Sequence, residues 1–120
     1  MTGRLEAYRH GRRAETLAAW RLRLAGWRIL AHNWRSPVGE IDLIARRGNV
    51  IAFVEVKARR AASDAMAAVT ARSQARIRRA AENWLSCHPE HAMKTLRFDL
   101  VLITSRLWPR HVPNAFGADR

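Results

Sequence analysis

The chain has 120 residues, and 48% of them are hydrophobic, which is enough for one domain with one modest core. Its net charge of +12 and pI near 11.7 predict a polyanionic partner, most simply nucleic acid, although an arginine-rich proteome that uses charge for solubility would produce the same excess. A single cysteine excludes an internal disulfide, and no apolar run reaches the length of a signal peptide or a membrane span, so we expect a cytoplasmic protein that does not enter membranes.

The first predicted element is a basic amphipathic helix over residues 4–25. Leu17 and Leu24 belong to its apolar side, and Gly26 follows where a helix end favours positive φ. Glu15 stands at the N-terminal end of the apolar stripe. Its carboxylate either pairs with a neighbouring arginine at the surface or points into a functional site.

Residues 27–34 form the first predicted strand, because Trp27 and Ile29 alternate with residues of the opposite face. We expect the segment 35–37 to break this strand at its proline. The loop then leads into an acidic hairpin, so Arg35 could approach a bound substrate, although such loops more often serve as simple connections.

The segment 39–57, GEIDLIARRGNVIAFVEVK, predicts two strands joined by a tight turn. Its apolar residues are rich in β-branched types, and their nearly continuous runs are typical of strands covered on both faces. The carboxylates of Glu40, Asp42 and Glu55 and the amine of Lys57 interrupt these runs. Charged groups inside buried strands need partners, a metal ion or a functional reason to be there.

The turn decides whether these charged groups meet. A two-residue loop at Gly48 and Asn49 would place Asp42 opposite Glu55, whereas a three-residue loop would turn them to opposite faces unless a bulge intervened. We predict an even register, because glycine and asparagine both tolerate the positive φ of a type I′ turn. Opposed carboxylates repel each other, so this pair indicates a divalent cation, and oxygen ligands suit Mg²⁺.

A purely structural interpretation is the alternative for the acidic hairpin. Lys57 would then form a salt bridge with Asp42 or Glu40, and an arginine would pair with Glu55. Lysine at position 57 fits both interpretations, so it does not choose between them.

Residues 58–69 are rich in small side chains and show no clear periodicity, so we expect a mobile loop that orders on DNA. Thr70 is a good N-cap for a helix over residues 71–87, which has an apolar stripe and many arginines on its other sides. Gln74 shares the buried edge of this helix, either as an ordinary glutamine near a helix start or as a site residue. The helix end is expected to be an ordinary loop without a metal, because its candidate ligands lack a fourth member: Cys87, His88 and His91.

The last part of the chain predicts further strands. Residues 97–104 form a buried strand, in which we expect Asp99 to pair with an arginine rather than to orient a site residue. Residues 107–112 are expected to form an edge strand that tolerates a proline. The segment 113–120 is expected to be a loose tail, although Phe116 is apolar enough to dock.

An acidic residue, a hairpin and then Glu-x-Lys on the next strand resemble the core of the PD-(D/E)XK nucleases, which share a restriction-endonuclease-like fold. More narrowly, the phrases GEIDLIA, FVEVKAR and RFDLV resemble the YraN family of small bacterial proteins over about residues 11–116. That family is described as endonuclease-like and close to the archaeal Holliday junction resolvases. Together with the predicted elements, the resemblance implies one α/β domain over residues 1–120, with a central mixed sheet of about four to five strands flanked by helices in the order α-β-β-β-α-β-(β).

The hairpin residues take definite roles in this interpretation. Asp42, Glu55 and the Val56 carbonyl would bind Mg²⁺ or Mn²⁺, and Lys57 would orient or help to activate the attacking water. Glu40 would take an outer-shell role or pair with Lys57.

Two helical residues are assigned by the resemblance. Glu15 matches the glutamate that many PD-(D/E)XK nucleases carry on the first helix. Gln74 matches a glutamine that reaches the active site in several of them, although Arg78 stands where an aromatic residue often follows.

These features predict a Mg²⁺-dependent DNA endonuclease that hydrolyses phosphodiester bonds, with branched or damaged DNA as candidate substrates. The alternative is a catalytically weak nucleic-acid-binding protein that keeps the nuclease-like fold. Junction resolvases act as dimers, and a homodimer would suit paired incisions. The side chains expected to hold the DNA backbone are all arginines: Arg12, Arg13, Arg35, Arg59, Arg60, Arg72, Arg76 and Arg79.

Overall fold

The computed structural model describes residues 2–60, 62–104 and 108–116, with side chains described from residue 12 onward except at 62 and 65. A long helix precedes three strands, and two further helices and a short 3₁₀ helix precede the last two strands. The elements are α1 (Thr2–Leu24), β1 (Arg28–Ser36), β2 (Gly39–Arg47), β3 (Val50–Ala58), α2 (Ala62–Ala67), α3 (Ala71–Cys87), η1 (Pro89–His91), β4 (Thr95–Ile103) and β5 (Arg110–Val112).

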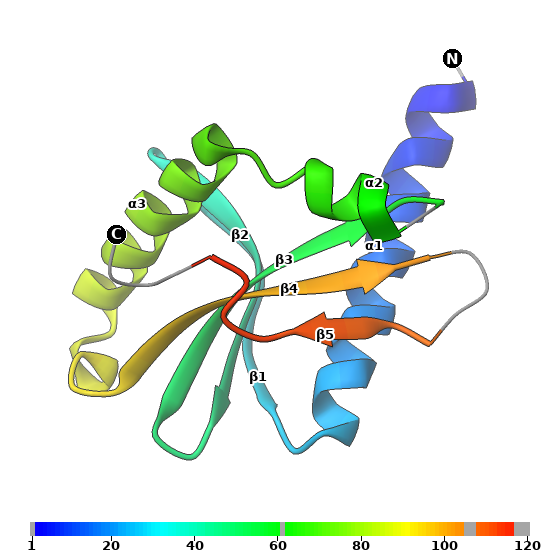
Figure 1. Cartoon of the computed structure of the whole chain (residues 1–120). Coiled ribbons are helices and arrows are strands. Elements are labelled where there is room, and N and C mark those ends of the chain that lie inside the picture. The colour runs from blue at the N-terminus through cyan, green and yellow to red at the C-terminus, as the bar shows by residue number, and fades with distance from the viewer. Residues whose placement is uncertain (1, 61, 105–107, 117–120) are drawn as a thin grey trace.

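The strands form one mixed sheet of five in the order β1-β2-β3-β4-β5, as Figure 1 shows. All neighbouring strands are antiparallel except β3 and β4, which are parallel. A parallel pair needs a crossover connection, and the helices α2 and α3 supply it. The α/β fold class and the order of elements predicted from the sequence are therefore confirmed. Within the described residues, no helix combines the length and the apolar character needed to cross a membrane.

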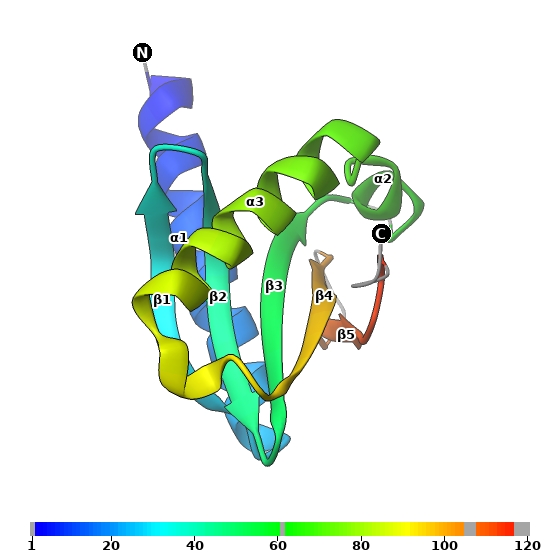
Figure 2. The ribbon, with the colours of Figure 1, turned by 90° about the vertical axis from the view of Figure 1, so that its left-hand side faces the viewer.

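Helices cover both faces of the sheet, with α3 in front and α1 behind in the view of Figure 2. On the α3 face, the buried side chains of Ile44, Ile51 and Phe53 pack with Ile77 and Trp84 of the helix. The ring of Phe53 meets that of Trp84 edge to face, with centroids 5.8 Å apart. This cluster fixes the height of α3 above the hairpin and so positions any side chain that α3 directs at it.

The α1 face has its own cluster, in which Leu43, Ala45 and Val54 of the sheet pack with Ala18 and Leu22 of the helix. Because residues two apart in a strand share a face, this set alternates along each strand with the set under α3. Burial on both faces explains the nearly continuous apolar runs of β2 and β3.

The buried stripe of α1 is narrower than the sequence suggests. The helix ends before Gly26, which has φ +90° as expected for its position. Ala18 and Leu22 are fully buried, but Leu17 is 49% and Leu24 is 68% exposed. Leu17 and Leu24, which the sequence assigns to the apolar side of the helix, are therefore not buried, because α1 packs on the sheet through Ala14, Ala18, Ala19 and Leu22.

The hairpin has the predicted even register, with Arg47 opposite Val50 and Leu43 opposite Val54. The predicted type I′ turn is wrong in detail. Gly48 has φ +59°, but Asn49 is not among the residues with positive φ, whereas type I′ requires positive φ at both positions. The register is nevertheless the predicted one, because it depends on the number of residues in the loop and not on the φ angle of Asn49.

Two predicted boundaries need correction. Strand β1 does not break at residue 35 but continues through Ser36, and a tight turn then leads to Gly39 of β2. The segment 58–69 is not simply a loop, because it contains the short helix α2. Three of the six residues of α2 are alanine, which has high helix propensity, so the helix forms although the segment shows no apolar periodicity.

Helix α3 begins and ends where the sequence predicts. The hydroxyl of Thr70 accepts a hydrogen bond from the backbone N–H of Ser73 at 3.2 Å, which satisfies one of the free donors of the first turn. Beyond its end, the predicted loop contains the single turn η1.

The chain after β5 is held against the sheet as far as residue 116. The N–H of Ala115 donates to the Phe98 carbonyl at 2.8 Å, and Phe116 is buried against the Phe98 ring. The expected docking of Phe116 is confirmed, and residues 113–116 do not form a loose tail. Residues 117–120, and the predicted strand start at 107, lie outside the described residues.

Candidate active site

The acidic side chains of the hairpin lie on the sheet face that α3 covers. Ile44 is opposite Phe53, and both belong to the cluster under α3. Asp42 and Glu55 lie two residues further along their strands, so they share that face. The regular pairing of β2 with β3 ends at Leu43. Beyond it the Val56 N–H donates to Oδ2 of Asp42 at 2.8 Å, so the carboxylate replaces a backbone acceptor where the strands diverge.

These side chains line a cavity of about 190 Å³ between the hairpin and the first turns of α3. The hairpin contributes Glu40, Asp42, Glu55 and Lys57, and α3 contributes Ser73, Arg76 and Ile77. Gln74 is not among the lining residues, whereas its neighbour Ser73 is. Positions 73, 76, 77 and 80 share one side of a helix, so the helical phase of the buried Ile77 and Ala80 would have indicated Ser73 and Arg76.

Asp42 is the most perturbed acid of the cavity. Burial and the nearby Glu55 carboxylate raise its pKa to about 7, although the Val56 N–H and Lys57 act in the opposite direction. The two carboxylates are therefore close enough to repel, and near neutral pH they do not both carry full charge without a compensating cation.

Lys57 supplies part of that compensation. Its Nζ lies 2.9 Å from Oε1 of Glu55, and both side chains are mostly buried. Glu40 does not pair with Lys57 but lies 3.4 Å from Nε of Arg35, with both groups exposed. The purely structural interpretation of the hairpin predicted a salt bridge from Lys57 to Asp42 or Glu40. Lys57 instead pairs with Glu55 on its own strand.

Glu15 approaches the same acidic set from α1. Burial raises its pKa, the carboxylates of Glu40 and Glu55 raise it further, and Arg12 and Arg35 lower it. Glu15 does not line the cavity, but its interactions with two of the hairpin acids place its carboxylate beside the site.

The oxygen ligands of this cavity suit a hard cation that takes only a few of its ligands from the protein. Within the described part of the chain, no group of three or more His, Cys, Asp or Glu side chains is arranged to hold a metal ion. Asp42, Glu55 and the Val56 carbonyl nevertheless offer oxygen ligands, and Mg²⁺ commonly takes one or two carboxylates and fills its shell with water. Repulsion by Glu55 is, after burial, the next cause of the raised pKa of Asp42, and a bound cation would relieve it.

An arginine-lined groove of about 520 Å³ adjoins the cavity and shares Glu40 and Arg76 with it. The turn between β1 and β2 forms one wall with Arg35, and α3 forms the other with Arg72, Arg76 and Arg79. The two walls touch closely, since a Cβ on Gly39 would lie 2.9 Å from the Arg76 carbonyl oxygen.

The remaining predicted DNA-binding arginines lie elsewhere. Arg13, Arg59 and Arg60 line a different groove, and Arg12 is exposed on α1 near Glu15. The tertiary structure therefore divides the predicted set between two surfaces.

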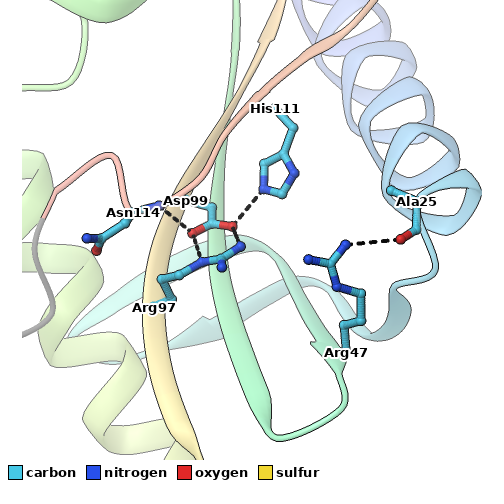
Figure 3. Close-up of polar contacts among 6 residues, drawn as sticks. All are labelled: Ala25, Arg47, Arg97, Asp99, His111 and Asn114. Carbon is cyan, nitrogen blue, oxygen red and sulfur yellow. Dashed lines mark hydrogen bonds and ion pairs between the residues drawn. The ribbon is translucent and has the colours of Figure 1, made fainter.

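Asp99 belongs to a separate, structural network, shown in Figure 3. Its fully buried carboxylate accepts two hydrogen bonds from Arg97, at 2.9 and 2.8 Å, and lies 2.6 Å from Nε2 of His111. The N–H of Asn114 donates to the same carboxylate at 2.9 Å. The predicted arginine partner is confirmed, and the network ties β5 and the segment after it to β4.

The mixed sheet between two helices, with Asp, Glu-x-Lys and a helix over one face, defines an α/β protein with a restriction-endonuclease-like arrangement. Residues 14–103 match the uncharacterised protein family UPF0102, and the chain belongs to this family. It is the family that the phrases GEIDLIA, FVEVKAR and RFDLV indicate under the name YraN.

Relatives within the family are similar over nearly their whole length. A UPF0102 protein of Chelativorans sp. (strain BNC1) is 55% identical over 115 residues, which cover 96% of this chain and 93% of the relative. A UPF0102 protein of Bradyrhizobium diazoefficiens is 56% identical over 96% of this chain and 86% of its own length. A third, from Rhodopseudomonas palustris, is 55% identical over 96% and 88%.

Proposed function

We propose that this protein is a Mg²⁺-dependent endonuclease that hydrolyses phosphodiester bonds in DNA. The observation that carries the proposal is the pair of carboxylates, Asp42 and Glu55, in one cavity beside Lys57, where burial and repulsion by Glu55 raise the pKa of Asp42 to about 7. A strongly perturbed acid in a lined cavity is a common property of functional sites. The adjoining groove with four arginines supports a polyanionic substrate.

The residues of the chain divide the work. Asp42, Glu55 and the Val56 carbonyl would hold the cation, for which Mn²⁺ is an alternative to Mg²⁺. When bound, such a cation lowers the pKa of a coordinated water and neutralises phosphate oxygens. Lys57, already 2.9 Å from Glu55, would orient the attacking water and stabilise charge that develops on the phosphate.

The other site residues would act around this centre. Arg76 lines both the cavity and the groove, so it would hold a phosphate next to the bond that is cut. Glu15 and Glu40 would remain in the outer shell, where they add negative potential that favours a divalent ion. Gln74 does not line the cavity, so we assign it no role in catalysis. Ser73 lines the cavity and would lie beside the substrate.

A second candidate function has one observation in its favour. The Lys57–Glu55 ion pair and the Val56–Asp42 hydrogen bond give both carboxylates a partner within the chain itself. In a protein that binds nucleic acid without cutting it, these two interactions would stabilise the carboxylates without a metal, and the arginines would bind the phosphates.

Cleavage assays separate the two functions. Purified protein is incubated with linear, branched and single-stranded DNA, with and without Mg²⁺ or Mn²⁺, beside Asp42→Asn, Glu55→Ala and Lys57→Ala. We expect metal-dependent cutting that each substitution lowers by at least about 100-fold, because each removes a group that acts on the metal or the water.

Glu82→Ala is the matched control, since Glu82 is an exposed acid on α3 outside the cavity. It should cut like the wild type. Cutting that survives Glu55→Ala and Lys57→Ala would indicate a contaminant, and binding without any metal-dependent cutting would favour the second function.

A further inference from the structure

A second groove lies at the ends of β3 and β4, beside α1, and its volume is about 590 Å³. Leu17 of α1 and Ile103 of β4 give it apolar walls, and Arg13, Arg59 and Arg60 contribute positive charge. Arg59 and Arg60 follow directly on β3, two and three residues after Lys57 of the candidate active site. The groove therefore begins close to that site.

An exposed apolar strip on α1 continues from this groove. Leu17, Trp20 and Leu24 are 49%, 56% and 68% exposed, and their spacing places them on one side of the helix. The guanidinium of Arg23 lies 5.5 Å from the centre of the Trp20 ring. An indole that is more than half exposed, next to arginines, is an open stacking surface.

The two grooves differ in chemistry. The groove beside α3 combines four arginines with the β1–β2 turn and has no aromatic side chain, which suits contacts to phosphates alone. The α1 surface combines arginines with an exposed tryptophan and leucines. Duplex DNA hides the faces of its bases, whereas an unpaired strand exposes them, and aromatic and arginine side chains are the groups that bind such strands.

Charge complementarity also distinguishes between occupants of the α1 surface. The chain carries a net charge of +12, and the charged residues that line this groove are all arginines. A second copy of the chain would bring arginines against arginines. A strand of DNA brings phosphates to the arginines and bases to the indole.

We propose that the surface formed by Arg13, Leu17, Trp20, Arg59 and Arg60 binds an unpaired DNA strand, with a base stacked on Trp20. The inference rests on the proposed function, because it assigns this strand to the substrate of the same active site. The substrate then has paired DNA on the groove beside α3 and single-stranded DNA on the groove beside α1.

Binding without metal tests this inference separately from cleavage. Fluorescence anisotropy measures the affinity for a labelled oligonucleotide of about 12 thymidines and for a duplex of equal length, in EDTA. We expect Trp20→Ala to weaken thymidine-oligonucleotide binding roughly tenfold or more, because base–aromatic stacking is lost, and to leave duplex binding unchanged. Trp20→Phe, which keeps a ring, should retain most of the affinity.

Trp108→Ala is the matched control, since Trp108 is the other tryptophan that is more than half exposed among the described residues. It should bind both DNAs like the wild type, and circular dichroism melting should show that all variants fold. Unchanged oligonucleotide affinity in Trp20→Ala would overturn the proposal. So would an equal loss for duplex DNA, or an equal loss in Trp108→Ala.

Sedimentation velocity checks the competing occupant. A wild-type dimer that Trp20→Ala converts to a monomer would identify the α1 surface as a self-association face and reject the strand. Failure of the nuclease proposal gives a different pattern: no cutting under any condition, with Trp20-dependent oligonucleotide binding intact.

Discussion

Asp42 on β2 and Asp99 on β4 are both carboxylates within the sheet, and their surroundings shift their pKa values in opposite directions. Burial and Glu55 raise the pKa of Asp42 to about 7. Burial also acts to raise the pKa of Asp99, but hydrogen bonds from His111, Arg97 and the Asn114 N–H outweigh it and lower that pKa to about 2. Asp99 has hydrogen-bond donors for its charge and therefore stabilises the fold. Asp42 faces another carboxylate, and a cation between the two would lower their repulsion.

Metal binding should therefore depend on Asp42. Without metal, the raised pKa of Asp42 means that its contribution to stability falls as pH rises from about 4 to about 7, so Asp42→Asn should melt at a higher temperature than wild type at pH 8. Mg²⁺ at about 100 times its Kd should stabilise the wild type by about 2.7 kcal/mol and leave Asp42→Asn unaffected.

Differential scanning fluorimetry with and without Mg²⁺ or Mn²⁺ measures both effects, and Glu82→Gln serves as the exposed-acid control. An equal metal-induced shift in wild type and Asp42→Asn would place the ion elsewhere.

Asp99 should give the opposite dependence on pH. Because its folded pKa of about 2 lies below the ordinary value of 3.8, its contribution is complete above about pH 4 and is lost as pH falls toward 2. We expect the wild type to lose about 2 kcal/mol of unfolding free energy over this range from this group, and Asp99→Asn to be less stable at pH 7 with a flatter acid limb.

Urea unfolding at several pH values checks this prediction, with Asp64→Asn as the control, since Asp64 is exposed on α2. If Asp99→Asn kept the wild-type slope between pH 4 and 2, another carboxylate would have to account for it.

At the scale of elements, the turn between β1 and β2 and the helix α3 act as one unit. Gly39 has φ +154°, and its missing side chain lets the turn approach the backbone of α3 at Arg76. The same contact forms the junction between the cavity of the candidate active site and the groove with four arginines. The position of Arg76 therefore depends on a glycine in a different element.

Gly39→Ala should displace this junction. The new Cβ would lie 2.9 Å from the Arg76 carbonyl oxygen, so we expect a loss of about 2–3 kcal/mol from the clash and the unfavourable φ, together with weaker DNA binding. Gly48→Ala is the control, because φ there is +59° with no atom within 4 Å, and it should cost only about 1 kcal/mol.

Urea unfolding and DNA titration of both variants make the comparison. Equal destabilisation of the two would show that φ alone, and not the contact with α3, determines the cost.

At the scale of the whole molecule, the fold separates positive charge into two surfaces, one that adjoins the acidic cavity and one at the ends of β3 and β4. Arg35, Arg72, Arg76 and Arg79 surround the groove beside α3, whereas Arg59 and Arg60 leave β3 toward the other groove. An isolated acidic site would repel DNA. In the proposed function, the arginines on both sides would hold the phosphates near the carboxylates, and a bound cation would shield the like charges from one another.

The groove beside α3 should dominate the salt dependence of duplex binding. We expect Arg79→Ala to weaken binding to any duplex sequence and to reduce the slope of log K against log salt by about 1, because one phosphate contact is lost. Arg28→Ala is the matched control: Arg28 is also exposed but lies at the opposite end of β1 from Arg35, outside the groove.

Anisotropy titrations over a range of salt concentrations measure both slopes. Equal slopes for the two variants would mean that net charge, and not this groove, holds the duplex.

Features that depend on local geometry could be predicted from the amino-acid sequence alone. The alternation and turn length of residues 39–57 were sufficient to place Asp42 and Glu55 on one face, because side chains in a strand repeat every two residues. Thr70 set the start of α3, since capping involves only the first helical turn. Asp99 was expected to need an arginine because a buried charge must be paired.

Features that arise where distant elements come together required the folded structure. The packing of Ile77 and Trp84 on the sheet sets the first turns of α3 above the hairpin, which brings Ser73 and Arg76 to the cavity. The folded structure also raised the pKa of Asp42, which requires both burial under α3 and the nearness of Glu55.

The exposure of Leu17, Trp20 and Leu24 also lay beyond the sequence. An amphipathic pattern shows that a helix has an apolar side, but the curvature and width of the surface that receives it determine how much of that side is covered. These three side chains are exposed to solvent because the part of α1 that contacts the sheet is narrower than the apolar side of the helix.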